Sequence, residues 1–170
     1  MTSLPRLFLA AALSACALVA APALAGVEHQ PQDGTKPAYE VEVPDGWVVN
    51  RDEQGNLYIL AGDHSGGLIL NIVAGDNADH LSLDDLAAQL ISLAQAPAPS
   101  RTEADAIGGV KGKAFYSTIP EEQGAVSLKL VLVKLDATHV ASEGVIENSA
   151  ITPDQHAALM ALAARVRFIR

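Results

Sequence analysis

Cysteine is nearly absent from this chain of 170 residues, since Cys16 is its one cysteine. A single cysteine excludes an internal disulfide, so the stability of the fold has to come from core packing. Basic residues are also few, with 11 Lys and Arg against 20 Asp and Glu, and the formal net charge is −9. A surface of that charge repels nucleic acid and anionic lipid headgroups, which argues against both as partners.

Apolar runs long enough for a membrane are missing too, except at the N-terminus. After the basic Arg6, small and apolar residues fill positions 7–25 and end in Ala23-Leu24-Ala25. A positive start, an apolar middle and a small-x-small end are typical of a secretory signal peptide. The run could span a bilayer, but Pro22 and the abundance of alanine make it a weak anchor. We therefore expect cleavage after Ala25, a periplasmic or secreted protein, and no transmembrane span in the mature chain.

A second interpretation of the same segment is a lipoprotein signal. Leu13-Ser14-Ala15-Cys16 resembles the lipobox of bacterial lipoproteins, in which the cysteine becomes the lipidated first residue. Residues 17–25 stay apolar, however, where a lipoprotein usually has a polar tether. Lipidation at Cys16, with anchoring to the envelope, is therefore the alternative, and Cys16 as a small apolar residue of a signal core is the favoured interpretation.

The rest of the chain predicts one domain. Residues 26–37 are mostly polar, contain Pro31, Gly34 and Pro37, and show no hydrophobic period, which predicts a flexible tether. The hydrophobic pattern that follows has the length expected for one domain with one core. The predicted organisation is a signal peptide at 1–25, a tether at 26–37 and a single α+β domain at 38–170.

Local patterns predict the elements of that domain. Ser82 is expected to cap a helix with apolar residues at three- and four-residue steps, and Pro97 and Pro99 end it. Thr152, Pro153 and Gln155 predict a capping box that opens a second helix, with Leu159, Met160, Ala163 and Val166 on its core face. Alternating or β-prone runs predict strands at 39–43, 57–61, 68–73, 101–107, 110–119, 126–133 and 138–146.

This order predicts an α+β fold in which an antiparallel sheet of about six to seven strands is flanked by two main helices. The layout, with an opening strand that ends in Pro44-Asp45-Gly46-Trp47, resembles the PsbP-like α/β/α sandwich family. The resemblance implies binding and assembly rather than catalysis, and no site motif of the family matches residues of this chain. Fold alone does not choose a function.

One segment invites a catalytic interpretation. Residues 62–67, Gly-Asp-His-Ser-Gly-Gly, are similar to the nucleophile loop of trypsin-like proteases with His64 inserted. The insertion displaces Ser65 from the loop geometry that makes it a nucleophile, and Gly, Asp and Ser are turn formers. A hairpin turn is favoured, and a hydrolase that uses Asp63, His64 and Ser65 is the alternative.

Metal binding is the second candidate chemistry. Asp76, Asp79 and His80 offer ligands after the strand at 68–73, and Asp63-His64 precede it. The strand separates the two groups by roughly 20 Å, so one shared site is not expected. The second group lacks the glycine and the distant glutamate of a calcium loop. A solvated turn is favoured, with Asp76, Asp79 and His80 as weak metal candidates, and no cofactor is expected.

Three further features are weaker candidates for a functional site. The segment 108–113 ends in Gly-Lys, as a phosphate-binding P-loop does, but Ile107 stands where the first glycine of a P-loop is needed, so a hairpin turn is expected. His139 and His156 are expected to be ordinary surface or packing residues. The sequence therefore predicts an exported, non-enzymatic binding or assembly module of the bacterial envelope. Its ligand, an unidentified peptide, protein or small molecule, is expected in an apolar groove between helix and sheet. A lipoprotein anchored at Cys16 and a small hydrolytic or metal-dependent enzyme are the alternatives.

Overall fold

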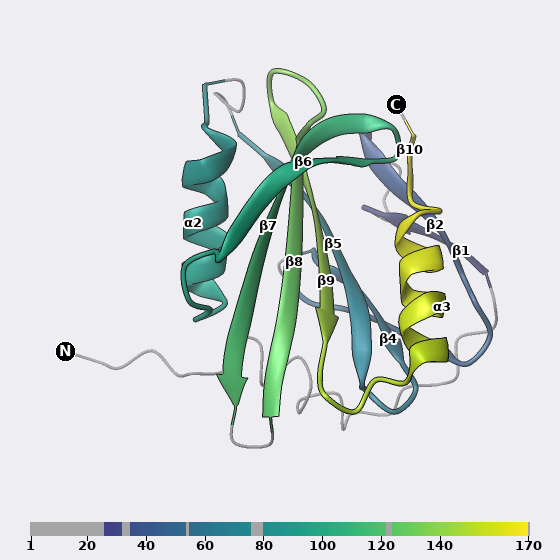
Figure 1. The fold of residues 1–170 in the computed structure, drawn as a ribbon. Coiled ribbons are helices and arrows are strands. Elements are labelled where there is room, and N and C mark those ends of the chain that lie inside the picture. Colours follow the sequence, from purple (N-terminus) through teal and green to yellow (C-terminus); the bar gives the residue numbers. More distant parts are fainter. Residues whose placement is uncertain (1–25, 32–34, 54, 76–79, 122–123, 170) are drawn as a thin grey trace.

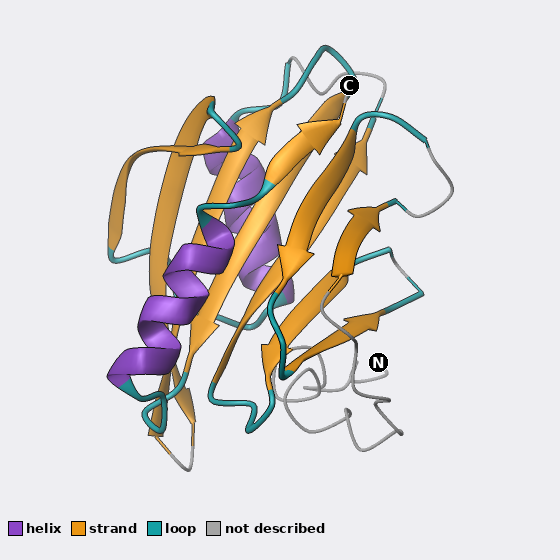
Figure 2. Ribbon diagram, turned by 90° about the vertical axis from the view of Figure 1, so that its right-hand side faces the viewer, coloured by secondary structure: helices purple, strands orange, loops and turns teal. Residues whose placement is uncertain are grey.

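The computed structural model describes residues 26–31, 35–53, 55–75, 80–121 and 124–169. The predicted signal peptide and Cys16 lie outside these residues. The described chain forms a large twisted sheet, a small sheet and two helices, with α2 and α3 on opposite faces of the large sheet (Figures 1 and 2). The predicted α+β class, with helices on both faces of an antiparallel sheet, is confirmed.

The large sheet has seven strands, and every neighbouring pair in it is antiparallel. Six of the seven correspond to strands that apolar or alternating runs in the sequence predict, whereas the strand at 47–51 was not predicted. In spatial order they are β3 (Trp47–Arg51), β4 (Leu57–Ala61), β5 (Gly66–Ala74), β9 (His139–Glu147), β8 (Gly124–Lys134), β7 (Val110–Glu121) and β6 (Arg101–Ile107).

Both helices begin where the capping residues predict. In α2 (Leu83–Leu93) the Ser82 side chain accepts hydrogen bonds from the backbone N–H groups of Asp84 and Asp85. In α3 (Pro153–Ala163) Thr152 and Gln155 form the reciprocal capping box, at 2.9 and 3.3 Å. Local hydrogen bonding therefore sets the start of each helix.

Two cores lie on the two faces of the large sheet. Along β8, Val131 and Val133 contribute to the core under α3, whereas Leu130 and Leu132 contribute to the core under α2. Successive side chains of a strand point to opposite faces, so a continuous apolar run serves a strand that is covered on both sides.

The small sheet differs from the expectation. Its order is β1 (Gly26–Gln30), β2 (Ala38–Val43) and β10 (Arg167–Ile169), so residues expected to form a tether form a strand, and a short strand that was not predicted follows the last helix. The expected opening strand pairs with β1 and β10, where Gly26 lies opposite Val43 and Phe168 opposite Tyr39. The single-sheet arrangement is therefore wrong for this strand, because its partners come from the two ends of the chain.

Contacts distant in sequence explain why polar residues form β1. Arg51 of β3 donates to the Glu28 carboxylate at 2.6 Å and to the side-chain oxygen of Gln30 at 3.3 Å. On the other side of β2, the rings of Tyr39 and Phe168 lie 5.0 Å apart. Neither end of the chain has a local hydrophobic pattern that predicts these pairings.

The last helix is shorter than expected. It ends at Ala163, and Val166 is buried in the link to β10 rather than on the helix. Leu159 and Leu162 are its buried residues, whereas Met160 and Ala163 are partly buried against the same core. The backbone N–H groups of Arg165 and Val166 donate to carbonyl oxygens three residues earlier, and these turns redirect the chain toward β2.

Candidate functional site

A half-open groove of about 420 Å³ lies between the C-terminal half of α2 and the large sheet. The helix packs mainly over β8, so the neighbouring part of the same face, on β9, β5 and β4, is left to line the groove. Its helix side and β8 contribute Leu90, Ile91, Leu93, Ala94, Leu128 and Leu130. Leu93 is 69% exposed, so the apolar lining reaches solvent at the rim.

The floor is a row of paired residues across four strands. Tyr58 of β4 lies opposite Ile69 of β5, Ile69 opposite Gly144 of β9, and Gly144 opposite Leu130 of β8. A Cβ at Gly144 would stand 3.6 Å from the Cβ of Ile69, an ordinary contact, and its backbone has no positive φ that requires glycine. The strand itself does not require glycine at position 144. The absence of a side chain there deepens the groove.

The polar side of the groove comes from β4, β5, β9 and the turn before β4. It consists of Asn56, Tyr58, Asn71 and Ser142, and Asn71 lies directly opposite Ser142. The hydroxyl of Ser142 donates to the backbone oxygen of Asn71 at 3.4 Å. Within the described chain, no hydrogen bond engages the side-chain amide of Asn71, which leaves a donor and an acceptor for a ligand.

Asp52 orients two of the polar residues. Its carboxylate accepts hydrogen bonds from the Asn56 side chain at 2.6 Å and from the Tyr58 hydroxyl at 2.7 Å. It also accepts from the backbone N–H of Asn56 at 2.8 Å. The polar side of the groove is therefore held in place before any ligand arrives.

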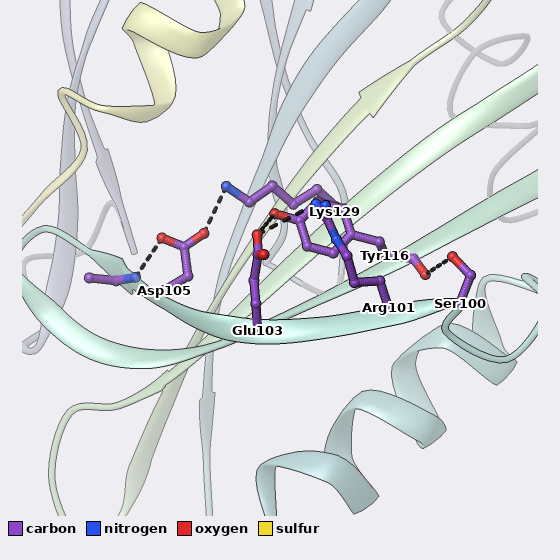
Figure 3. Close-up of polar contacts among 7 residues, drawn as sticks. Ser100, Arg101, Glu103, Asp105, Tyr116 and Lys129 are labelled. Carbon is purple, nitrogen blue, oxygen red and sulfur yellow. Dashed lines mark hydrogen bonds and ion pairs between the residues drawn. The ribbon is translucent and has the colours of Figure 1, made fainter.

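A second polar cluster lies on the opposite face of the sheet, beneath the curled strand β6 (Figure 3). Arg101 stacks on the ring of Tyr116 with 3.8 Å between the guanidinium carbon and the ring centroid, and the Tyr116 hydroxyl donates to Glu103. Asp105 pairs with Lys129 at 2.8 Å. Charged side chains that point inward from an edge strand protect that edge from pairing with other chains.

Glu143 is buried at this second cluster, directly behind the groove. It stands between Ser142 and Gly144 in β9, and it is 5% exposed. Burial raises its pKa to about 8, with nearby Lys129 acting in the opposite direction and Asp105 adding to the rise. Its Oε2 atom has no hydrogen-bond partner among the described residues. The buried carboxyl is therefore neutral at pH 7.

Residues 62–65, where a hairpin turn was favoured over a nucleophile, form the turn between β4 and β5, and this turn docks against the start of α3. Gln155 donates to the Asp63 carboxylate at 2.7 Å, and the side chain of Asn148 donates to the backbone oxygen of His64 at 3.3 Å. Hydrogen bonds from Ser65 and Gln155 lower the pKa of Asp63 to about 2. Ser65 is 1% exposed, and within the described chain it makes no hydrogen bond to the ring of His64. The segment holds α3 to the sheet.

The other candidates from the sequence are the possible metal ligands near residue 80 and two further histidines. Asp76 and Asp79 fall outside the described residues, and His80 is exposed shortly before α2. Among the residues that the structure describes, no group of three or more His, Cys, Asp or Glu side chains could hold a metal ion. His139 pairs with Asp136 at 2.9 Å, and His156 pairs with Glu147 at 2.5 Å.

The polar residues of the groove and Glu143 were missed by sequence reasoning. Two local signals point to them in retrospect: Asn71 interrupts the apolar run of β5, and Gly144 interrupts a strand. A glycine inside a strand often marks a site where a ligand or another backbone approaches closely. Neither signal shows that the two residues share one face of the sheet.

No family model matches this chain, and no curated protein matches it. Among solved structures, the cyanobacterial PsbP (CyanoP) of Synechocystis sp. PCC 6803 is similar, with a TM-score of 0.57 and 11% identity over 86% of this chain and 95% of that chain. A protein from Bacteroides thetaiotaomicron has a TM-score of 0.51 and 14% identity over 78% of this chain. The match covers 45% of that protein, so the chain spans less than half its length.

Neither described helix has the length and apolar character that a bilayer crossing needs.

At 11% and 14% identity the two structural likenesses concern the fold alone. They agree with the topology described above, and the resemblance to the PsbP-like α/β/α sandwich is confirmed at the level of the fold.

Proposed function

We propose that this protein is an exported, non-enzymatic binding module of the bacterial cell envelope that holds its ligand in the groove between α2 and the sheet. The observation that carries the proposal is the groove floor at Gly144. There a missing side chain creates depth beneath an apolar wall with a few oriented polar groups. Ligand sites are typically concave and mostly apolar, with volumes of about 300–1,000 Å³.

The non-enzymatic part of the proposal is supported by the chemistry of the lining. None of the described residues that line the groove is a carboxylate, a histidine, a lysine, an arginine or a cysteine. The hydroxyls of Ser142 and Tyr58 would need a general base beside them to act in catalysis, and none of the lining residues supplies one. Neutral amides and hydroxyls suit recognition of a ligand better than its conversion.

Export is supported by the N-terminal sequence pattern, and the alternative is anchoring through a lipid on Cys16. Intact-mass measurement of the protein from the envelope of its native host separates the two. A chain that begins at Gly26 is expected. A diacylated or triacylated chain that begins at Cys16 would replace the secreted form with a lipoprotein.

Filling the groove tests the proposal. The probe is N-phenyl-1-naphthylamine, a neutral dye whose fluorescence rises in apolar surroundings. Gly144→Leu is expected to weaken dye binding at least about tenfold, because its side chain occupies the groove beside Ile69. Gly75→Leu is the matched control, since a Cβ at Gly75 meets no atom within 4 Å and the residue lies outside the lining.

Unfolding curves of both variants keep the test informative. If Gly144→Leu does not fold, the smaller Gly144→Ala and Gly144→Val variants replace it, with a graded loss of dye binding expected. Unchanged dye binding by a folded, groove-filled variant would contradict the proposal.

A further inference from the structure

The two sides of the groove differ in chemistry. The side formed by α2 and β8 is apolar, whereas the side formed by β4, β5 and β9 carries Asn56, Asn71 and Ser142. We infer that the ligand is a neutral amphiphile, with one apolar chain against α2 and β8 and an amide- or hydroxyl-bearing head against Asn71. The inference rests on the proposed function, because it names the chemical class of the ligand for the same groove.

Charge excludes the commonest amphiphiles. None of the twelve lining residues carries a charge, so a buried carboxylate, phosphate or ammonium head would lack a counter-charge among them. The carboxylate of Asp52 lies behind Asn56 and Tyr58 and repels an anion on the polar side. The net charge of −9 acts in the same direction at longer range. Fatty acids and anionic phospholipid heads are therefore unfavourable occupants.

Asn71 specifies the head more closely. Its side-chain amide has no hydrogen-bond partner within the described chain, and it offers both a donor and an acceptor. A ligand that covers this amide without pairing it would leave a desolvated polar group, which is unfavourable. A head with an amide or hydroxyl satisfies Asn71, while a plain hydrocarbon does not.

The volume limits the length of the ligand. At about 30 Å³ for each water-sized group, the 420 Å³ of the groove holds roughly fourteen such groups. A chain of about ten to twelve carbons with a small head has this size. A folded protein segment is larger and would extend beyond the groove at the exposed Leu93.

The test compares probes by calorimetric titration of the mature protein at concentrations where each probe is monomeric. N-lauroylethanolamine carries a neutral amide and hydroxyl head. Laurate and dodecylammonium have the same chain length with charged heads. We expect the neutral probe to bind at least about tenfold more tightly than either charged probe. A leucine- and alanine-rich decapeptide and phosphatidylcholine vesicles represent a peptide and a membrane surface, and no binding to them is expected.

Two variants assign the effect to the groove. Asn71→Leu keeps the side-chain volume and removes the hydrogen bonds. It is expected to weaken N-lauroylethanolamine about five- to tenfold relative to N-phenyl-1-naphthylamine, whose binding relies on apolar contacts. Gly144→Leu is expected to weaken both ligands.

The outcomes separate this inference from the proposed function. Dye binding that Gly144→Leu abolishes, together with equal affinity for neutral and charged probes, would overturn the inference and leave the binding function standing. Preference for the decapeptide or the vesicles would overturn it in favour of that class of partner. Loss of neither ligand in folded Gly144→Leu would overturn both.

Discussion

Lys129 of β8 lies 2.8 Å from Asp105 of β6, although β7 separates these two strands in the sheet. The contact is possible because β6 curls over the face of the sheet and also contacts β8 (Figure 1). In the turn that joins β6 to β7, Gly108 adopts a φ of +55° and lies close to the ring of Phe168 in β10. The ion pair therefore fastens the edge strand to the centre of the sheet.

A double-mutant cycle measures the strength of this ion pair. Asp105→Asn, Lys129→Met and the double variant are compared by urea unfolding. Because each side chain is 30% exposed, we expect a coupling free energy of up to about 1 kcal/mol, which falls in high salt. A coupling indistinguishable from zero at low salt would show that packing alone holds β6 in place.

Glu143 predicts a pH dependence of stability. Its folded pKa of about 8 lies above the ordinary value of 4.5, so between these values the folded protein binds a proton that the unfolded chain has lost. The contribution of this group is therefore fully present below about pH 4.5 and is lost as the pH rises through 8, by up to about 1.4 kcal/mol per pH unit.

Glu143→Gln is the matched variant, since it keeps the shape of the protonated carboxyl. We expect it to flatten the stability profile between pH 5 and 8 and to be more stable than the wild type at pH 8. Urea unfolding at several pH values measures both effects. Parallel wild-type and variant profiles would contradict the assignment.

Asp63 acts in a different pH range. Its folded pKa of about 2 lies below the ordinary value of 3.8, so its contribution is present above about pH 4 and is lost as the pH falls through 2. Asp63→Asn is expected to lower the melting temperature at pH 6 and to differ less from the wild type at pH 2. A constant difference across this range would mean that the carboxylate charge does not hold the β4–β5 turn to Gln155.

Two strand glycines are expected to lose very different amounts of stability when replaced by alanine. A Cβ at Gly112 would collide with the backbone oxygen of Leu132 in the neighbouring strand, whereas one at Gly144 makes only ordinary contacts. Gly112→Ala should therefore destabilise the protein by about 3 kcal/mol or more, and Gly144→Ala by less than about 1 kcal/mol. Thermal unfolding of the two variants compares them directly, and similar losses would contradict the open floor of the groove.

Local patterns were sufficient for six strands of the large sheet and for both helix starts. Apolar alternation in β8 and capping by Ser82 and Thr152 depend on a few neighbouring residues. The strand and the helix starts can therefore be predicted from the sequence alone. The expectation of an apolar groove between helix and sheet came from the fold class that these elements imply. It named no residue of the groove.

The sequence by itself determined six strands of the large sheet and the starts of both helices, because capping and side-chain alternation depend on residues close together in the chain. Only the tertiary structure decided that β1 and β10 join β2, that Asp105 reaches Lys129, and that Asn71, Ser142 and Gly144 share one groove. These arrangements depend on strand register and on the curl of β6, which bring together residues far apart in sequence. No local pattern records such pairings, since their free energy arises from burial and hydrogen bonds that exist only after the chain has folded.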